Sequence, residues 1–242
     1  DTLESLDGLQ LAANTGSIIL EWLPALVNVD AIAQATTIDT LVLSGTGLTS
    51  FPVVDQLVYV ASLSIGANEA LADLSTLGVL QAVGALSIAG NPSLGALPQF
   101  SQLSSFDDFT VIGNAALTEV QLDFPSLEDR TRSIGEHDLQ LNSGGYIEVS
   151  YNDNLQHITS PANTVSAQAI SIFQNPSLVD VDLGQLSHAD VLLIDDNAVL
   201  GSVAIPSLAT VNLLEVIDNP ALSPAVFDGV DTFTRQLSGN AE

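Results

Sequence analysis

A short pattern of apolar and polar positions recurs along this chain of 242 residues. Its clearest copy is residues 86–94 (LSIAGNPSL), and related copies begin at Leu63, Ile170, Leu192 and Leu214. Each copy contains an asparagine, and successive marker asparagines are 23, 23, 38, 23, 22 and 22 residues apart. The marker asparagines are Asn68, Asn91, Asn114, Asn152, Asn175, Asn197 and Asn219. A regular period in the twenties predicts a solenoid of stacked coils.

The alternation around each asparagine predicts a short strand that ends at a corner. The residues five and three before it are apolar, as Leu86 and Ile88 are before Asn91, and the residue between them is mostly polar. Side chains two apart lie on one face of a strand, so this face should point inward. The asparagines are predicted to be structural corners, because asparagine tolerates left-handed backbone and its amide can satisfy buried backbone groups from coil to coil.

Further apolar positions after each asparagine predict three short faces in a coil of 22 to 23 residues. About nine coils at a spacing of roughly 4.8 Å would give a rod on the order of 40 Å long. We therefore expect a β-solenoid that forms a single domain over residues 1–242. Residues 1–17 would form an N-terminal cap, residues 18–222 the coils, and residues 223–242 a C-terminal cap.

The C-terminal cap is predicted to be a helix. Ser223 and Pro224 suit an N-cap and a first helical position, respectively. An apolar stripe at helical spacing follows and should seal the last coil. The stripe comprises Val226, Val230, Phe233 and Leu237. Solvent exposure of Val226, Phe233 and Leu237 would argue against this closed cap.

One coil carries an insertion of about 15 residues, placed at about 128–145. Loops that project from repeat proteins often carry the binding function. The candidate partner-binding residues are Arg130, Arg132, His137 and Tyr146. The alternative is a surface excursion without a binding role.

The pattern L-x-I-x-x-N-P-x-L, with a closing F/I-P-S-L at residues 124–127 and 205–208, resembles the receptor L-domain family. This resemblance covers roughly residues 18–222. It implies a right-handed β-helix related to leucine-rich repeats, found in receptor ectodomains and in fungal and bacterial surface proteins. A standard leucine-rich repeat has its leucine two residues after the asparagine and no intervening proline, so this chain departs from that spacing. The disulfide-rich modules that flank the receptor versions are lacking, and signalling is not implied.

The charge balance narrows the choice of partners. The chain has 29 acidic and 3 basic residues, with a formal net charge of −26 and no lysine. Phosphate contacts need Lys and Arg, so this surface should repel nucleic acid and anionic membrane, and nucleic-acid binding is excluded. Cations or a cationic partner are favoured. There is no cysteine, which rules out zinc sites with cysteine ligands, and no apolar run long enough for a transmembrane segment.

Four acidic residues form a candidate calcium site, and no other cofactor is expected. Asp196 and Asp218 each precede a marker asparagine by one residue, with Asp195 and Glu215 nearby on the same face. Carboxylates stacked one coil apart repel each other unless they are solvated or bridged by a cation, and calcium prefers such oxygen ligands. A solvated acidic surface is the alternative, because the segment lacks the motifs of dedicated calcium loops.

The sequence gives little support for catalysis or for ice binding. The adjacent carboxylates Asp107 and Asp108 should point to opposite faces of a strand, as should Asp195 and Asp196. His137, His157 and His188 show no nucleophile or metal-ligand spacing. The outward positions do not form the threonine array expected for ice binding.

We therefore expect a non-catalytic, extracellular cell-surface module for adhesion or binding, which recognises a protein or glycan partner. The alternative is a self-assembling structural subunit of an extracellular filament or surface layer. The two hypotheses differ in whether the ends of the solenoid are closed or can pair with another copy.

Overall fold

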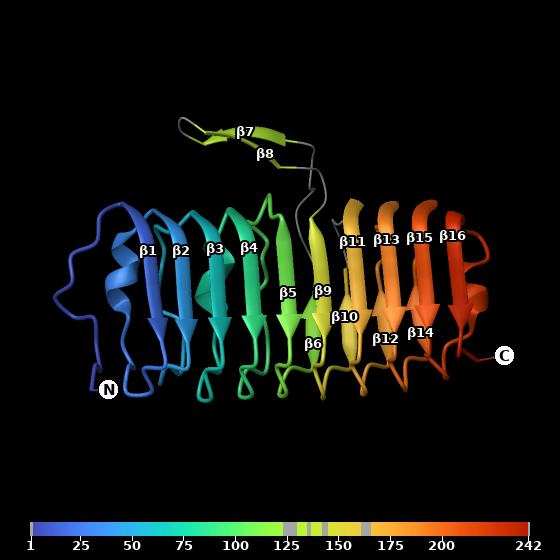
Figure 1. Cartoon of the computed structure of the whole chain (residues 1–242), viewed down its shortest axis with the longest axis horizontal. Coiled ribbons are helices and arrows are strands. Elements are labelled where there is room, and N and C mark those ends of the chain that lie inside the picture. The colour runs from blue at the N-terminus through green and yellow to red at the C-terminus, as the bar shows by residue number, and fades with distance from the viewer. Residues whose placement is uncertain (1, 123–129, 135–136, 142–144, 161–165, 242) are drawn as a thin grey trace.

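The computed structural model describes residues 2–122, 130–134, 137–141, 145–160 and 166–241. The chain winds through successive coils that stack along one axis, and each coil contributes a strand to one large sheet (Figure 1). The predicted β-solenoid is confirmed. None of the described helices is long and apolar enough to cross a membrane.

The large sheet has ten strands, and every neighbouring pair is parallel. In spatial order its strands are β1 (Asn14–Glu21), β2 (Thr37–Ser44), β3 (Tyr59–Gly66), β4 (Ala82–Ala89), β5 (Asp108–Ile112), β9 (Tyr146–Ser150), β11 (Ser166–Phe173), β13 (His188–Asp195), β15 (Thr210–Ile217) and β16 (Asp231–Ser238). The register aligns the repeats, so that Leu86 pairs with Leu63 and with Phe109. Equivalent apolar positions therefore form continuous buried columns.

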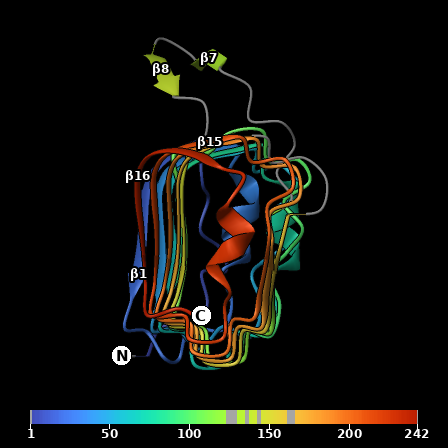
Figure 2. The ribbon, with the colours of Figure 1, turned by 90° about the vertical axis from the view of Figure 1, so that its right-hand side faces the viewer.

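A second face of the solenoid changes character along the axis. Its first coils carry one-turn 3-10 helices, η1 (Asp30–Gln34) and η2 (Ser75–Val79). Later coils form a parallel four-stranded sheet instead. This sheet comprises β6 (Glu119–Gln121), β10 (His157–Thr159), β12 (Asp180–Asp182) and β14 (Ser202–Ala204). Viewed along the axis, the 3-10 turns lie across the coil from the large sheet, and the core lies between the two faces (Figure 2).

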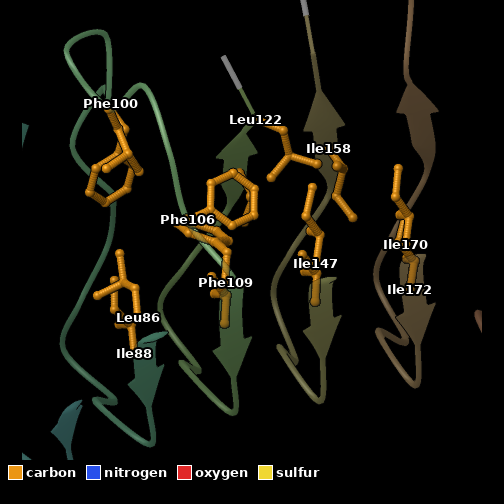
Figure 3. Close-up of a cluster of buried hydrophobic side chains, with 14 of the residues drawn as sticks. Leu86, Ile88, Phe100, Phe106, Phe109, Leu122, Ile147, Ile158, Ile170 and Ile172 are labelled. Atoms are coloured by element: carbon orange, nitrogen blue, oxygen red, sulfur yellow. The ribbon is translucent and has the colours of Figure 1, made fainter. Parts of the chain in front are cut away.

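The period is interrupted between β5 and β9, and aromatic side chains fill the core there (Figure 3). Phe109 packs against Phe100 with ring centroids 5.5 Å apart and against Phe106 at 6.0 Å. All three side chains are buried. A Cβ on Gly145 would lie 2.6 Å from the Phe106 ring, so glycine is needed where the chain returns to the stack.

The insertion contains an antiparallel hairpin of β7 (Arg130–Ile134) and β8 (His137–Leu141). The hairpin stands away from the coils, beyond the amino ends of the large-sheet strands (Figures 1 and 2). Parts of the predicted 128–145 segment lie outside the described residues.

The C-terminal helix prediction is wrong. A one-turn 3-10 helix, η3 (Pro224–Phe227), is followed by β16, which pairs in parallel with β15. A short isolated helix is marginal in water, whereas the open edge of β15 offers a ready row of backbone partners. Phe233, expected in the apolar stripe, is 93% exposed, and Val226 is 40% exposed.

The C-terminal end of the core is covered in another way. In β16, Leu237 continues the buried column of Val216 and packs against the core. Arg235 follows Leu214 in the neighbouring column, and its side chain contacts Asp228 at 3.4 Å. Leu214 and Val216 are fully buried beneath this last coil.

At the other end, the segment before β1 adds a partial layer. Ser5 forms a parallel bridge with Asn28, and Leu6 donates its backbone N–H to the Asn28 carbonyl at 3.0 Å. Val27 in turn donates to the Glu4 carbonyl at 2.9 Å. Leu6 lies against the core, so this segment covers part of the first coil.

Candidate functional site

The strands of the large sheet end at a line of residues with left-handed backbone, which we call the corner column. It lies along the lower edge of the solenoid in Figure 1. The non-glycine members have φ between 52° and 58°, and the glycines between 62° and 67°. The members are Trp22, Gly45, Ala67, Gly90, Gly113, Tyr151, Gln174, Asp196, Asp218 and Gly239. Left-handed backbone favours glycine, so a bulky residue here stores strain.

In every coil that has a marker asparagine, the left-handed residue is the one before it, which corrects one part of the sequence prediction. The marker asparagines were expected to adopt this backbone themselves, but the left-handed angle falls on the residue before them. The asparagines turn inward instead, and all seven marker asparagines are fully buried.

The buried asparagines form an asparagine ladder that joins successive coils, as predicted. The Asn175 backbone N–H donates to Oδ1 of Asn197 at 3.1 Å, and the Asn175 Nδ2 donates to the same oxygen at 3.3 Å. Nδ2 of Asn175 also donates to the carbonyls of Val149 and Phe173, each at 3.0 Å. Each marker asparagine thus satisfies backbone groups that water cannot reach.

The sequence pattern did not predict either end of the ladder. At the N-terminal end Thr46 replaces asparagine, and its backbone N–H and hydroxyl both donate to Oδ1 of Asn68. At the C-terminal end Asn240 accepts from the Asn219 N–H at 3.1 Å. Asn240 follows Asn219 by 21 residues, close to the period. Arg235 occupies the apolar position five residues before it, which hid this last repeat.

At the N-terminal end of the corner column the chain forms an open groove of about 780 Å³, the Trp22 groove. Its lining includes Trp22, Pro24, Gly45, Ala67, Glu69 and Ala70. The Trp22 side chain lies against Gly45, where a Cβ would come within 2.9 Å of Cε3, yet Trp22 remains 69% exposed. The sequence places Trp22 near the first coil but does not reveal that it belongs to the corner column.

The C-terminal end of the corner column is acidic. Asp196 and Asp218 occupy equivalent positions in neighbouring coils, as the sequence predicted, and both have left-handed backbone. Asp195 pairs with Ile217 at the ends of β13 and β15. Partial burial, followed by the carboxylates of Asp218 and Asp196, raises the pKa of Asp195 above its ordinary value. Glu215, on β15, adds a smaller contribution.

This acidic corner, comprising Asp195, Asp196, Glu215 and Asp218, does not close into a metal site. Within the described ranges, no three His, Asp or Glu side chains are grouped so that they could hold a metal ion. One Asp196 oxygen accepts from the Gln174 side chain at 3.2 Å. The carboxylates repel one another along the corner rather than converge on a point.

The four candidate residues of the insertion lie in different parts of the structure. Arg130 and Arg132 belong to β7 and His137 to β8, where His137 pairs with Ile134. The placement of these three side chains lies outside what the structure describes. Tyr146 is the first residue of β9 in the large sheet, and its hydroxyl contacts Ser171 Oγ at 3.3 Å.

The other two histidines are paired with carboxylates on different faces. His157 Nδ1 lies 2.7 Å from Asp180 Oδ2 on the four-stranded sheet. His188 Nε2 lies 3.4 Å from Asp190 Oδ1 on the large sheet, and its Nδ1 lies 2.9 Å from the Thr210 hydroxyl. The His157–Asp180 pair joins β10 to β12, whereas His188 and Asp190 both lie on β13. All four side chains are partly exposed.

Comparison of the chain with protein-family models, curated proteins and solved structures finds no match.

Proposed function

We propose that this chain is a non-catalytic binding module at the outside of a cell, and that the Trp22 groove is its contact site. The observation that carries the proposal is the placement of Trp22. A large aromatic ring is held at a strained left-handed corner, is 69% exposed, and lines a groove beside small residues. Exposed aromatic rings supply contact area with little loss of conformational freedom on binding.

The scaffold suits this role. The asparagine ladder holds the neighbouring coils from Thr46 onward, and the Trp22 backbone N–H donates to the Ser44 carbonyl at 2.8 Å, so the groove is built on a rigid element. Local backbone strain is often retained where a protein binds or reacts. The resemblance to receptor L-domains, including their right-handed, leucine-rich-repeat-like coil, supports an extracellular binding role.

A matched pair of variants tests this proposal. Trp22 and Tyr151 are both exposed aromatic residues in the corner column, but Tyr151 packs against Phe173 and does not line the groove. Alanine already occupies this backbone position at Ala67, so both alanine variants should fold. We expect wild-type protein to bind a subset of an immobilised panel of glycans and of basic, neutral and acidic proteins. Trp22→Ala should lose this binding and Tyr151→Ala should keep it.

Equal binding by wild type and Trp22→Ala, or no binding to the panel, would overturn the proposal. Circular dichroism and thermal melts of both variants would establish that a loss reflects the contact site and not unfolding.

The second candidate function is self-assembly into a filament or surface layer. It is favoured by the strands β1 and β16, which lie at the two edges of the large sheet with no neighbour beyond them among the described strands. The 93% exposure of Phe233 on β16 also favours it. Light scattering with calcium, and then with a chelator, distinguishes this candidate from a monomeric binding module.

A further inference from the structure

We propose that the Trp22 groove takes a cationic side chain, arginine or lysine, from a partner protein. This inference rests on the proposed function and names the chemistry of its ligand. Three features of the groove and its surroundings carry it: the exposed aromatic ring, a carboxylate in the same lining, and the charge of the chain.

The ring supplies the first interaction. Trp22 is the chain's one tryptophan, and it is the aromatic side chain that most strongly attracts a cation to its face. Gly45 lies under the ring, and Gly47 lets the backbone beside the groove pack against the Pro24 carbonyl oxygen, with which a Cβ would clash. A side chain with a flat or slender end can therefore lie along the exposed part of the ring.

Glu69 supplies the second interaction. It is the charged residue in the lining of the groove, it is exposed, and it follows Asn68 at the corner one coil beyond Thr46. A guanidinium or ammonium group on the ring could meet this carboxylate while its aliphatic stem covers the apolar lining.

The net negative charge of the chain favours a positively charged ligand. With 29 acidic and 3 basic residues, the surface attracts cations from a distance and repels anionic groups. Arg235, whose side chain the structure describes, lies at the opposite end of the stack against Asp228. A partner with basic residues therefore complements both the groove and its surroundings.

The test uses the fluorescence of Trp22, which reports the groove directly because the chain has one tryptophan. The probes are acetyl-Gly-Arg-Gly-amide and the same peptide with citrulline, which keeps the shape of arginine and removes its charge. We expect the arginine peptide to change the emission saturably and to bind about tenfold more tightly than the citrulline peptide. Binding should weaken in 1 M salt.

Two groove variants and one control variant test this result further. Glu69→Gln should weaken the arginine peptide about fivefold and leave the citrulline peptide unchanged. Trp22→Ala, followed by calorimetry, should abolish saturable binding of the arginine peptide, whereas Tyr151→Ala should retain it. Equal affinity for arginine and citrulline peptides, or an unaffected Glu69→Gln variant, would overturn the inference.

Failure of the inference is distinguishable from failure of the proposed function. Chitohexaose and cellohexaose are titrated in parallel as neutral probes. If one of them binds in a Trp22-dependent manner and the arginine peptide does not, the groove remains a binding site but its ligand is a neutral glycan, and the cationic assignment is wrong. If no probe and no panel member requires Trp22, both proposals fail.

Discussion

The two ends of the solenoid differ in which part of the repeat they interrupt, the asparagine ladder at one end and a buried apolar column at the other. At the N-terminal end the apolar columns continue, because Ile18 and Leu20 on β1 pair with Leu41 and Leu43. The asparagine ladder stops there at Thr46. At the C-terminal end the ladder continues to Asn240, but one apolar column stops at Arg235. Each end therefore retains what the other end lacks.

This difference makes the two ends poor partners for each other. If a second copy stacked in register, Arg235 would face the column of Ile18, and Asn240 would meet Leu23, which has no amide oxygen to accept from it. Burying the Arg235 guanidinium and its Asp228 contact beneath another copy, and leaving backbone donors unsatisfied, would both cost free energy. Inward-pointing charge is a known guard on edge strands. We infer that the side chains at these open parallel edges oppose polymerisation.

The largest expected effect is a loss of folding stability, which should be greater at an interior position of the asparagine ladder than at its C-terminal end. Asn175→Ala removes the acceptor for Asn152 and the donor to the Val149 carbonyl, both in buried hydrogen bonds, and the donor to the Phe173 carbonyl in a part-buried one. It should destabilise the fold by about 3 kcal/mol. Asn240→Ala, at a part-buried position, should cost about 1 kcal/mol. Urea unfolding of both variants checks the order, and equal losses would show that the asparagines act as turn formers only.

The next variant restores the broken apolar column. Arg235→Leu should leave the monomer folded and promote end-to-end association, which Leu23→Asn should strengthen by offering an acceptor to Asn240. Sedimentation velocity over a range of concentrations measures this effect. Arg235→Gln is the control, because it keeps a polar group at the end of the column and should stay monomeric. A monomeric Arg235→Leu, Leu23→Asn double variant would contradict this account of the ends.

A smaller difference in stability, between two glycine variants of the corner column, tests how the Trp22 ring packs at the N-terminal end. Gly45→Ala and Gly90→Ala impose the same left-handed strain, about 1 kcal/mol. Only at Gly45 does the added Cβ meet the Trp22 ring, at 2.9 Å, whereas at Gly90 the nearest atom is 3.8 Å away. Gly45→Ala should therefore cost about 1 kcal/mol more and shift the Trp22 emission. Equal thermal stability of the two variants would show that the ring does not rest on Gly45.

The smallest effect concerns the acidic corner. Because the folded-state pKa of Asp195 is raised above 3.8, the folded chain holds its proton more tightly than the unfolded chain. The free energy of unfolding therefore falls as the pH rises from the pKa of Asp195 in the unfolded chain through its pKa in the folded chain. At neutral pH the ionised Asp195 destabilises the fold. Asp195→Asn should raise the melting temperature slightly at pH 7 and leave it unchanged near pH 3, below both values.

Melting curves of wild type and Asp195→Asn at both pH values provide this comparison. Asp182→Asn is the control, as an aspartate of the four-stranded sheet away from the acidic corner. An unchanged melting temperature of Asp195→Asn at pH 7 would show that the carboxylates are screened by solvent.

The sequence predicted the features that repeat and missed those that occur once. The marker asparagines and the two inward positions recur in nearly every coil, so their spacing revealed both the coil and the ladder. Arg235 interrupts that pattern, and the helical spacing of Val226, Val230 and Phe233 then favoured a helix over a final strand. Sequence spacing could not weigh the open edge of β15, which decides the outcome.

The candidate site was harder to predict for the same reason. The placement of Asp196 and Asp218 in neighbouring coils followed from the period, but their failure to converge depends on side-chain geometry. Trp22 lies in the first coil, where Leu23 replaces the marker asparagine. Its place in the corner column therefore becomes visible only in the register of β1 with β2.

The most direct test of the central claim, that the mismatched ends keep the chain a discrete binding module, is light scattering on the unmodified protein with calcium and then with excess chelator. The account predicts a monomer of 25.1 kDa in both conditions. Ordered assemblies whose mass grows with concentration would contradict it and would favour the structural subunit. If the assemblies dissolved in chelator, a cation would be joining the copies, and Asp196 and Asp218 would be the first residues to substitute.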